Sequence, residues 1–148
     1  MYIDLNLPVT NIMTEAVRFV YPDTLMSEVA DTFETTDFHH IPVLDEEGSI
    51  LGIISKVDYH QLQNKFTRLR FKDFKEKNDQ FMNSLTADEV MTKNPSCIHH
   101  ESTIATVIQV FMENLFHALP VTRGGQCIGI ITTHDILKFV STPSKSLV

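Results

Sequence analysis

Apolar and polar positions follow two recurring patterns along this chain, and each pattern occurs twice. The first is an apolar stripe at helical spacing, which predicts an amphipathic helix. It falls within residues 24–36 and again after Ser102, on these residues: Met26, Val29, Ala30 and Phe33, then Ile104, Val107, Ile108, Phe111 and Leu115. Thr24 and Ser102 stand just ahead of the stripes and are N-cap residue types, so we expect each helix to begin there.

The second pattern is a pair of short apolar stretches separated by a polar or glycine-rich turn, which is typical of a β-hairpin. In the first copy the stretches are residues 40–44 and 50–54, and in the second they are residues 118–122 and 127–131. Each copy therefore has a β-α-β-β-α pattern once the flanking segments are included, and we predict an α+β fold.

A second helix is expected directly after each hairpin. Ser55 and Thr132 are N-cap types, and Asp58 and Asp135 follow them at the spacing of a capping box. This pairing alone would stabilise each helix by about 1 kcal/mol.

The two copies are also related in sequence, with twelve identities in order across about 50 positions and one gap. Matched strings include Met13-Thr14 with Met91-Thr92, Phe38-His39 with Phe116-His117, and Gly52-Ile53-Ile54 with Gly129-Ile130-Ile131. We place the first repeat at residues 9–62, the second at 87–141 and a connector at 63–86. Because a unit this small is marginal alone, two copies should share one core.

The region between the repeats differs in composition. Residues 61–85 hold six basic and three acidic residues, no Gly or Pro, and four phenylalanines: Phe66, Phe71, Phe74 and Phe81. We expect a charged helical connector that packs its aromatic side chains on a neighbouring element. An arm that contacts a partner protein or a second copy is the alternative.

Composition narrows the classes of function. The 148 residues carry 19 acidic and 12 basic side chains, a net charge of −7, which disfavours a nucleic-acid partner. The two cysteines, Cys97 and Cys127, lie in predicted strands, form no Cys-x-x-Cys pair, and fit a reducing compartment. No signal peptide or membrane-spanning apolar stretch is visible, so we expect a cytoplasmic protein.

A metal site is not expected. Adjacent histidines on a strand point to opposite faces, which makes His39-His40 and His99-His100 poor chelating pairs.

The repeated strings together carry a family resemblance. His-His-Ile-Pro-Val and Gly-Ile-Ile-Ser-Lys-Val-Asp in the first copy match His-Ala-Leu-Pro-Val and Gly-Ile-Ile-Thr-Thr-His-Asp in the second, with Ile-Met-Thr or Val-Met-Thr ahead of each. This ordered set resembles the cystathionine-β-synthase (CBS) domain family, and the chain resembles a stand-alone tandem CBS pair.

The resemblance implies a regulatory module whose two pseudo-symmetric repeats pack through their sheets and often form a flat homodimer. It also implies clefts for adenosine compounds such as AMP, ADP, ATP or S-adenosylmethionine. In the family's Gly-x-x-Ser/Thr-x-x-Asp motif the Asp receives the ribose hydroxyls and the hydroxyl residue lies near the phosphate. These roles carry over to Ser55 and Asp58, and to Thr132 and Asp135.

General chemistry is compatible with both roles. A carboxylate can accept two hydrogen bonds from a ribose diol, and a helix N-terminus favours a phosphate. The alternative is that both pairs are capping boxes only, and the two interpretations are compatible.

Further candidate ligand contacts lie near each motif. Nucleotide-binding relatives often have His or Arg facing the phosphates before the proline, here His39, His40 and His117. His134, beside Asp135, is another candidate, and Thr14 and Thr92 match positions near the base or ribose.

Neither copy has Arg or Lys at the positions just before the proline. Because histidine is only partly charged at neutral pH, we expect AMP to be preferred to ATP, with binding weakening from about pH 6 to 8. The unequal copies suggest that one cleft fills before the other.

No nucleophile elbow, Walker sequence or His-Glu-x-x-His motif is present, so catalysis is not expected. We expect a sensor of an AMP-like adenosine nucleotide that acts on a separate, unidentified protein. The alternative is a protein-interaction scaffold of the same fold whose clefts no longer bind nucleotide.

Overall fold

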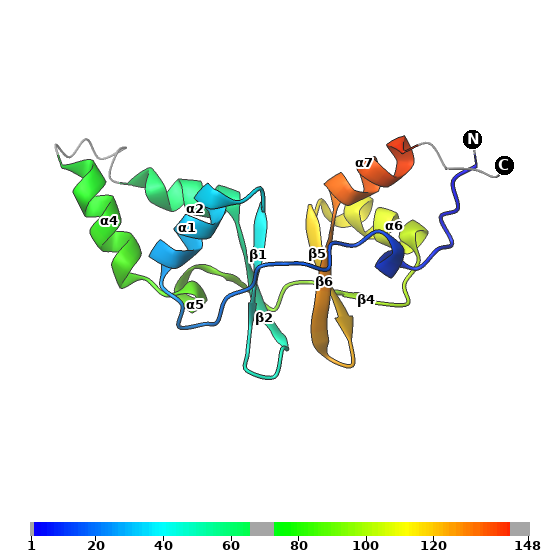
Figure 1. The fold of residues 1–148 in the computed structure, drawn as a ribbon, viewed down its shortest axis with the longest axis horizontal. Coiled ribbons are helices and arrows are strands. Elements are labelled where there is room, and N and C mark those ends of the chain that lie inside the picture. The colour runs from blue at the N-terminus through cyan, green and yellow to red at the C-terminus, as the bar shows by residue number, and fades with distance from the viewer. Residues whose placement is uncertain (1, 66–72, 143–148) are drawn as a thin grey trace. The chain divides into compact units, whose positions relative to one another are not determined.

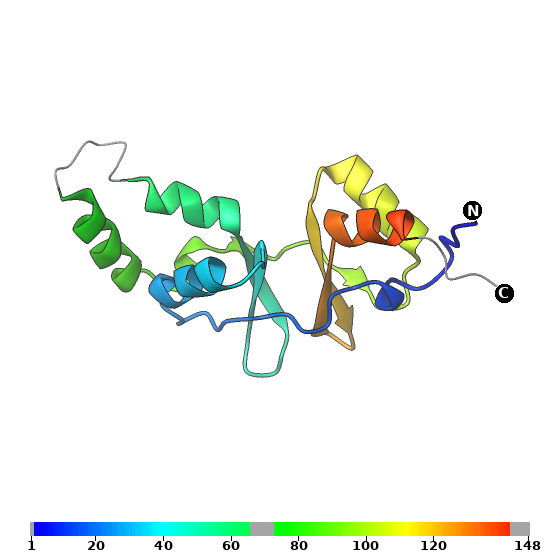
Figure 2. The ribbon, with the colours of Figure 1, turned by 45° about the horizontal axis from the view of Figure 1, so that its top comes forward.

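The computed structural model describes residues 2–65 and 73–142, which form two compact units. One unit spans Arg18–Pro95, and the other combines Met1–Val17 with Ser96–Val148. Each has a three-stranded sheet with helices, so the predicted α+β fold is confirmed (Figures 1 and 2). The segment that opens each sequence repeat lies in the unit built largely from the other repeat.

The unit of residues 18–95 is organised around the first hairpin. Its elements in chain order are α1 (Met26–Thr35), β1 (His40–Leu44), β2 (Ile50–Ser55), α2 (Lys56–Gln63), α4 (Phe74–Ser84), α5 (Ala87–Val90) and β3 (Thr92–Lys93). The antiparallel sheet has the order β1-β2-β3. Its register places His40 opposite Ser55 and Ile53 opposite Thr92.

The second unit repeats this arrangement with the second hairpin. Its elements are η1 (Val9–Asn11), β4 (Ile98–His99), α6 (Ile104–Asn114), β5 (Ala118–Arg123), β6 (Gln126–Thr132) and α7 (Thr133–Ser141). Strand β5 pairs with β4 in parallel and with β6 in antiparallel orientation. On the free side of β6, Thr14 forms an antiparallel bridge to Ile130, as Thr92 pairs with Ile53 in the first unit.

The glycine of each Gly-Ile-Ile string permits a close approach to a Met-Thr string. A Cβ atom on Gly129 would lie 2.8 Å from the backbone oxygen of Thr14 and 2.9 Å from Sδ of Met13. A Cβ atom on Gly52 would lie 2.6 Å from Cγ of Met91. Each Gly-Ile-Ile string therefore contacts the Met-Thr string of the other repeat.

The described buried residues form two clusters rather than the one shared core expected, and most residues of the predicted helical stripes belong to them. Met26, Val29 and Phe33 are fully buried in one cluster, and Val107 and Phe111 are buried in the other. Leu115 was expected on the second stripe but is 80% exposed. It follows the last residue of α6 as its C-cap and has a left-handed backbone, which turns it off the helix face.

The expected starts of α1 and α6 were each wrong by one residue, because Leu25 and Thr103 are the N-caps. The Thr24 hydroxyl accepts a hydrogen bond from the Tyr21 amide in the preceding turn. In α6 it is the Thr103 hydroxyl that accepts from an amide of the first turn, that of Thr106.

The connector contains a helix, α4, in the part that is described. Helix α4 packs against α1 and α2. Figures 1 and 2 show these three helices in the unit of residues 18–95. Phe66 and Phe71, two of the aromatic residues expected to pack, lie outside the described residues.

Two details of the second unit differ from expectation. Cys97 is exposed and lies just ahead of β4 rather than within a strand, whereas Cys127 lies in β6. The rings of His99 and His100 are 4.3 Å apart rather than on opposite faces, because β4 ends at His99 and strand alternation stops there.

Candidate ligand-binding site

Both predicted capping boxes are present at the N-termini of α2 and α7. The Ser55 hydroxyl accepts from the Asp58 amide at 3.1 Å, and the Asp58 carboxylate accepts from the Ser55 amide at 3.1 Å. Thr132 and Asp135 make the same reciprocal pair at 3.2 and 2.9 Å. The carboxylates are thereby held beside helix N-termini, where backbone amides and the helix dipole favour negative groups.

In the described structure the Asp135 carboxylate accepts more hydrogen bonds than the Asp58 carboxylate does. Its Oδ2 accepts from both the amide and the hydroxyl of Thr132, the latter at 3.0 Å. Its Oδ1 accepts from the Thr14 hydroxyl at 3.2 Å. Three of the predicted site residues are thus joined in one hydrogen-bonded group, and a ribose hydroxyl at Oδ1 would have to share or replace the Thr14 bond.

Asp58 has an open oxygen. Its Oδ2 accepts from the Ser55 amide, and within residues 2–65 and 73–142 nothing donates to Oδ1. Thr92 occupies the position equivalent to Thr14, but it is exposed in β3 and its hydroxyl makes no hydrogen bond to Asp58 in the structure described. The two sites therefore differ in the acceptor capacity that they offer to a ligand.

A pocket of about 630 Å³ adjoins Asp58. The residues that line it are Asp58, Gln61, Leu62, Lys65, Phe81, Leu85, Glu89 and Val90. The Lys65 ammonium lies 4.7 Å from the centre of the Phe81 ring, a cation–π contact. Sequence reasoning missed Lys65, Phe81 and Glu89 as site residues, and their only signal was the mixture of basic and aromatic residues in the connector.

The predicted histidines are divided between the units. His40 lies opposite Ser55 in the β1–β2 register, whereas the position opposite Thr132 is Ala118. His39 and His117 precede these strands, and their backbone oxygens accept from the first amides of α2 and α7.

Four of the predicted side chains are exposed: His39, His117, His134 and Thr92. Within the part of the chain that the structure describes, none of the four makes a side-chain hydrogen bond. The structure thus brings His40, Ser55 and Asp58 into one group, and Thr14, Thr132 and Asp135 into another.

Two other features of the described residues bear on possible function. They contain no group of three or more His, Cys, Asp or Glu side chains arranged to hold a metal ion. No helix among them combines the length and apolar character needed to cross a membrane.

Comparison with known families identifies the fold. The CBS domain model matches residues 9–61 and 87–142, which include both Gly-x-x-Ser/Thr-x-x-Asp motifs. The chain belongs to the CBS domain family. The tandem arrangement inferred from the sequence is thereby confirmed, and the matched CBS segments contain all ten predicted site residues.

Among curated relatives, the uncharacterized protein MJ1404 of Methanocaldococcus jannaschii is 27% identical over 140 residues, which is 93% of this chain and 29% of that protein. The inosine-5'-monophosphate dehydrogenase of the same organism is 26% identical over 128 residues, 86% of this chain and 22% of the enzyme. The CBS pair thus spans less than a third of the length of either relative.

Solved CBS pairs share the fold. CBSX2 in complex with AMP superposes with a TM-score of 0.73 at 21% identity, covering 90% of this chain and 96% of that one. The CBS domain pair of protein MJ0100, solved with 5'-methylthioadenosine and S-adenosyl-L-methionine, gives 0.72 at 21% identity, covering 90% and 94%.

Proposed function

We propose that this CBS pair is a regulatory module that binds an AMP-like adenosine compound and acts on a separate protein. The observation that carries the proposal is the Asp58 carboxylate, held by Ser55 at a helix N-terminus with its Oδ1 open beside a pocket. The AMP complex of CBSX2 and the S-adenosyl-L-methionine complex of MJ0100 support the choice of ligand class.

The proposed roles follow from the chemistry of each group. Asp58 Oδ1 accepts a ribose hydroxyl, and the Ser55 hydroxyl, at the N-terminus of α2, lies near the phosphate. His40, opposite Ser55, and the exposed His39 supply further donors. In the other unit Thr14, Thr132 and Asp135 take the equivalent roles, with His117 and His134.

We expect the Asp58 site to bind the ligand more tightly than the Asp135 site. At Asp58 a ribose hydroxyl can donate to Oδ1 without displacing another described hydrogen-bond donor. At Asp135 the same hydroxyl competes with Thr14, whose bond would be shared or lost. Since no Arg or Lys stands just before either proline, a single phosphate should be preferred to three.

Regulation requires that the ligand bind one conformation of the protein better than another. A regulated protein then responds to the favoured conformation. A second copy of the chain is also a proposed partner, which light scattering with and without AMP tests directly. We assign binding rather than catalysis to the module.

The experiment is a thermal-shift screen with AMP, ADP, ATP, S-adenosylmethionine and NAD. A ligand at about one hundred times its dissociation constant stabilises the folded state by about 2.7 kcal/mol, or several degrees. We expect AMP to give the largest shift, and Asp58→Asn to reduce it more than Asp135→Asn does. Thr103→Ala is the matched control, since it removes a helix cap away from both sites.

The outcomes distinguish the proposal from the scaffold alternative. A shift that persists unchanged in both Asp variants would place the ligand elsewhere. No response to any of the five compounds would instead favour a protein-interaction scaffold of the same fold.

A further inference from the structure

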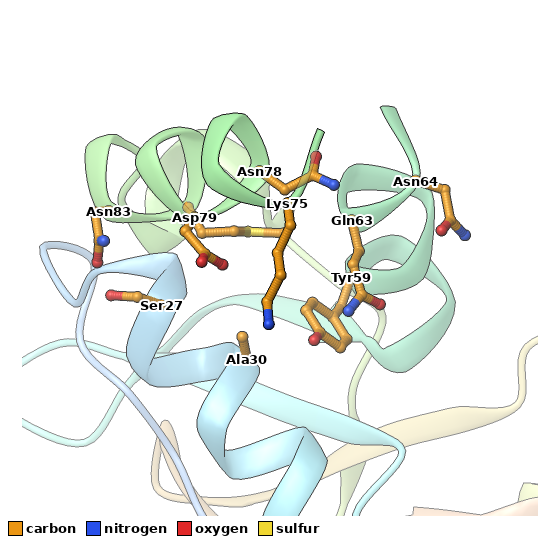
Figure 3. Close-up of a pocket in the computed structure, with 10 residues that line it drawn as sticks. Ser27, Ala30, Tyr59, Gln63, Asn64, Lys75, Asn78, Asp79 and Asn83 are labelled. Carbon is orange, nitrogen blue, oxygen red and sulfur yellow. The ribbon is translucent and has the colours of Figure 1, made fainter. Parts of the chain in front are cut away.

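A second pocket, of about 610 Å³, is bounded by α1, α2 and α4 in the unit of residues 18–95 (Figure 3). It is lined by Ser27, Ala30, Tyr59, Gln63, Asn64, Lys75, Asn78, Asp79, Met82 and Asn83. None of these is among the residues proposed to contact adenosine. The pocket exists because the connector helix α4 packs against the two helices of the first repeat.

Asn78 is the feature that points to a ligand. It is 8% exposed and is the only buried polar or charged residue in the described ranges 2–65 and 73–142. Its Oδ1 atom is shielded from solvent and accepts no hydrogen bond from any described group. A buried carboxamide oxygen without a donor is destabilising, so a donor from a bound molecule would complete the site once a group that covers Oδ1 moves aside to admit it.

The charges on α4 limit what that molecule can be. Lys75 and Asp79 are four residues apart, which places them on one face of the helix. Figure 3 shows both side chains extending from α4 toward the space beside α1. No ion pair joins them in the structure described, so one cation and one anion are presented separately to the pocket.

The other residues that line the pocket offer no exposed aromatic face on which a flat aromatic ligand could stack. The Tyr59 hydroxyl already donates to Glu34 at 2.8 Å. Its ring is stacked on Phe33 with centroids 5.6 Å apart, and the residue is only 4% exposed. The remaining contacts are uncharged hydrogen-bonding groups, with Ala30 and Met82 as apolar surface.

We propose that this pocket binds a small zwitterion of the α-amino-acid class. Lys75 receives its carboxylate, Asp79 receives its ammonium group, and Asn78 Oδ1 accepts a further hydrogen bond from that ammonium. Because α2 carries Asp58 in its first turn and Gln63 at its end, the adenosine and amino-acid sites share one helix. The module would thus have two small-molecule inputs.

The first measurement is a thermal-shift screen of the full chain with each of the twenty common α-amino acids at millimolar concentration. At least one should raise the melting temperature by a few degrees. Calorimetry then compares that amino acid with two analogues, the amine that lacks its carboxylate and the acid that lacks its ammonium group. Each analogue should bind about tenfold or more weakly than the amino acid.

Variants test the residue assignments. Lys75→Met and Asp79→Asn should each weaken amino-acid binding about tenfold. The matched controls are Lys77→Met and Asp73→Asn, which make the same charge changes on an ion pair between α4 and its N-cap residue, outside the pocket, and should leave the affinity unchanged. The AMP response should persist in all four, which separates this site from the adenosine site.

Asn78→Leu gives the decisive pair of results. Replacing an oxygen that lacks a donor with an apolar side chain of similar size should raise the melting temperature of the ligand-free protein and abolish its response to the amino acid. A lower melting temperature would mean that water or the protein itself satisfies Asn78. That result, or a screen without any response, would overturn the proposal whether or not AMP binds.

Discussion

The Thr14 hydroxyl donates a hydrogen bond to Oδ1 of Asp135 across 121 positions of sequence. Thr14 is brought there by the antiparallel bridge between its own backbone and Ile130 on β6. The equivalent Thr92 also pairs with its strand, opposite Ile53, yet its hydroxyl has no such bond in the described structure. Two positions that are equivalent in the repeats therefore have different energetic roles.

Thr14→Val should destabilise the protein, whereas Thr92→Val should have little effect. The first change removes a hydrogen bond to a partly buried carboxylate, which costs about 1–3 kcal/mol. The second changes an exposed side chain, for which about 0.5 kcal/mol or less is usual. Urea unfolding of both variants measures the difference, and equal losses would contradict the asymmetry seen here.

Alanine at the two close-approach glycines should be destabilising by about 1–3 kcal/mol, because each new methyl group overlaps a neighbour. The two cases differ in what can be relieved. At Gly52 the overlapping atoms all belong to the Met91 side chain, whereas at Gly129 the nearest is the Thr14 backbone oxygen.

Double variants separate these two cases. Met91→Gly should rescue most of the overlap cost in Gly52→Ala, since it removes the overlapping Sδ, Cγ and Cβ atoms together. Met13→Ala should rescue Gly129→Ala far less, because it leaves the Thr14 oxygen in place. Unfolding free energies of the four single and two double variants test this, and equal rescue at both sites would count against the described packing.

Local sequence signals were sufficient for the hairpins and for the second helix of each repeat. Ser55 with Asp58, and Thr132 with Asp135, combine an N-cap hydroxyl with a carboxylate at the right spacing, and that combination fixes where a helix begins. The start of α6 was less determined, because Ser102 and Thr103 are adjacent residues that are both of N-cap type.

Long-range placement was not predictable from the same signals. Periodicity describes the face that a segment buries, but it does not specify which repeat supplies the neighbour. The contact of Thr14 with Asp135 and the amide oxygen of Asn78 between packed helices both depend on such placement. The site motifs could be recognised in the sequence. That no described group donates to Oδ1 of Asp58 could be recognised only from the hydrogen bonds of the structure.

The start of α6 provides a direct test of the corrected cap. Thr103→Ala should lower the free energy of unfolding by about 1 kcal/mol, since it removes the acceptor for the Thr106 amide. Ser102→Ala should change it by about 0.5 kcal/mol or less, because the hydrogen bonds of Ser102 in the described structure use its backbone: its oxygen accepts from the Val9 amide, and its amide donates to the His99 oxygen. The reverse order in urea unfolding would restore Ser102 as the cap.

Tyr59 should make the stability of the protein fall at alkaline pH. Burial, the hydrogen bond to Glu34 and the nearby Glu34 and Asp79 carboxylates raise the pKa of Tyr59 above its ordinary value of 10.0. Below pH 10 both states keep the phenol proton; above it the unfolded chain loses the proton first, so stability falls by up to about 1.4 kcal/mol per pH unit.

Urea unfolding between about pH 8 and 11 should show a smaller decline for Tyr59→Phe than for the wild type. The variant should nevertheless be less stable than the wild type at pH 8, because it lacks the hydrogen bond to Glu34. The exposed Tyr21 is the control, and Tyr21→Phe should keep the wild-type decline. Parallel pH curves for Tyr59→Phe and the wild type would show that the phenol is not held in its neutral form by the fold.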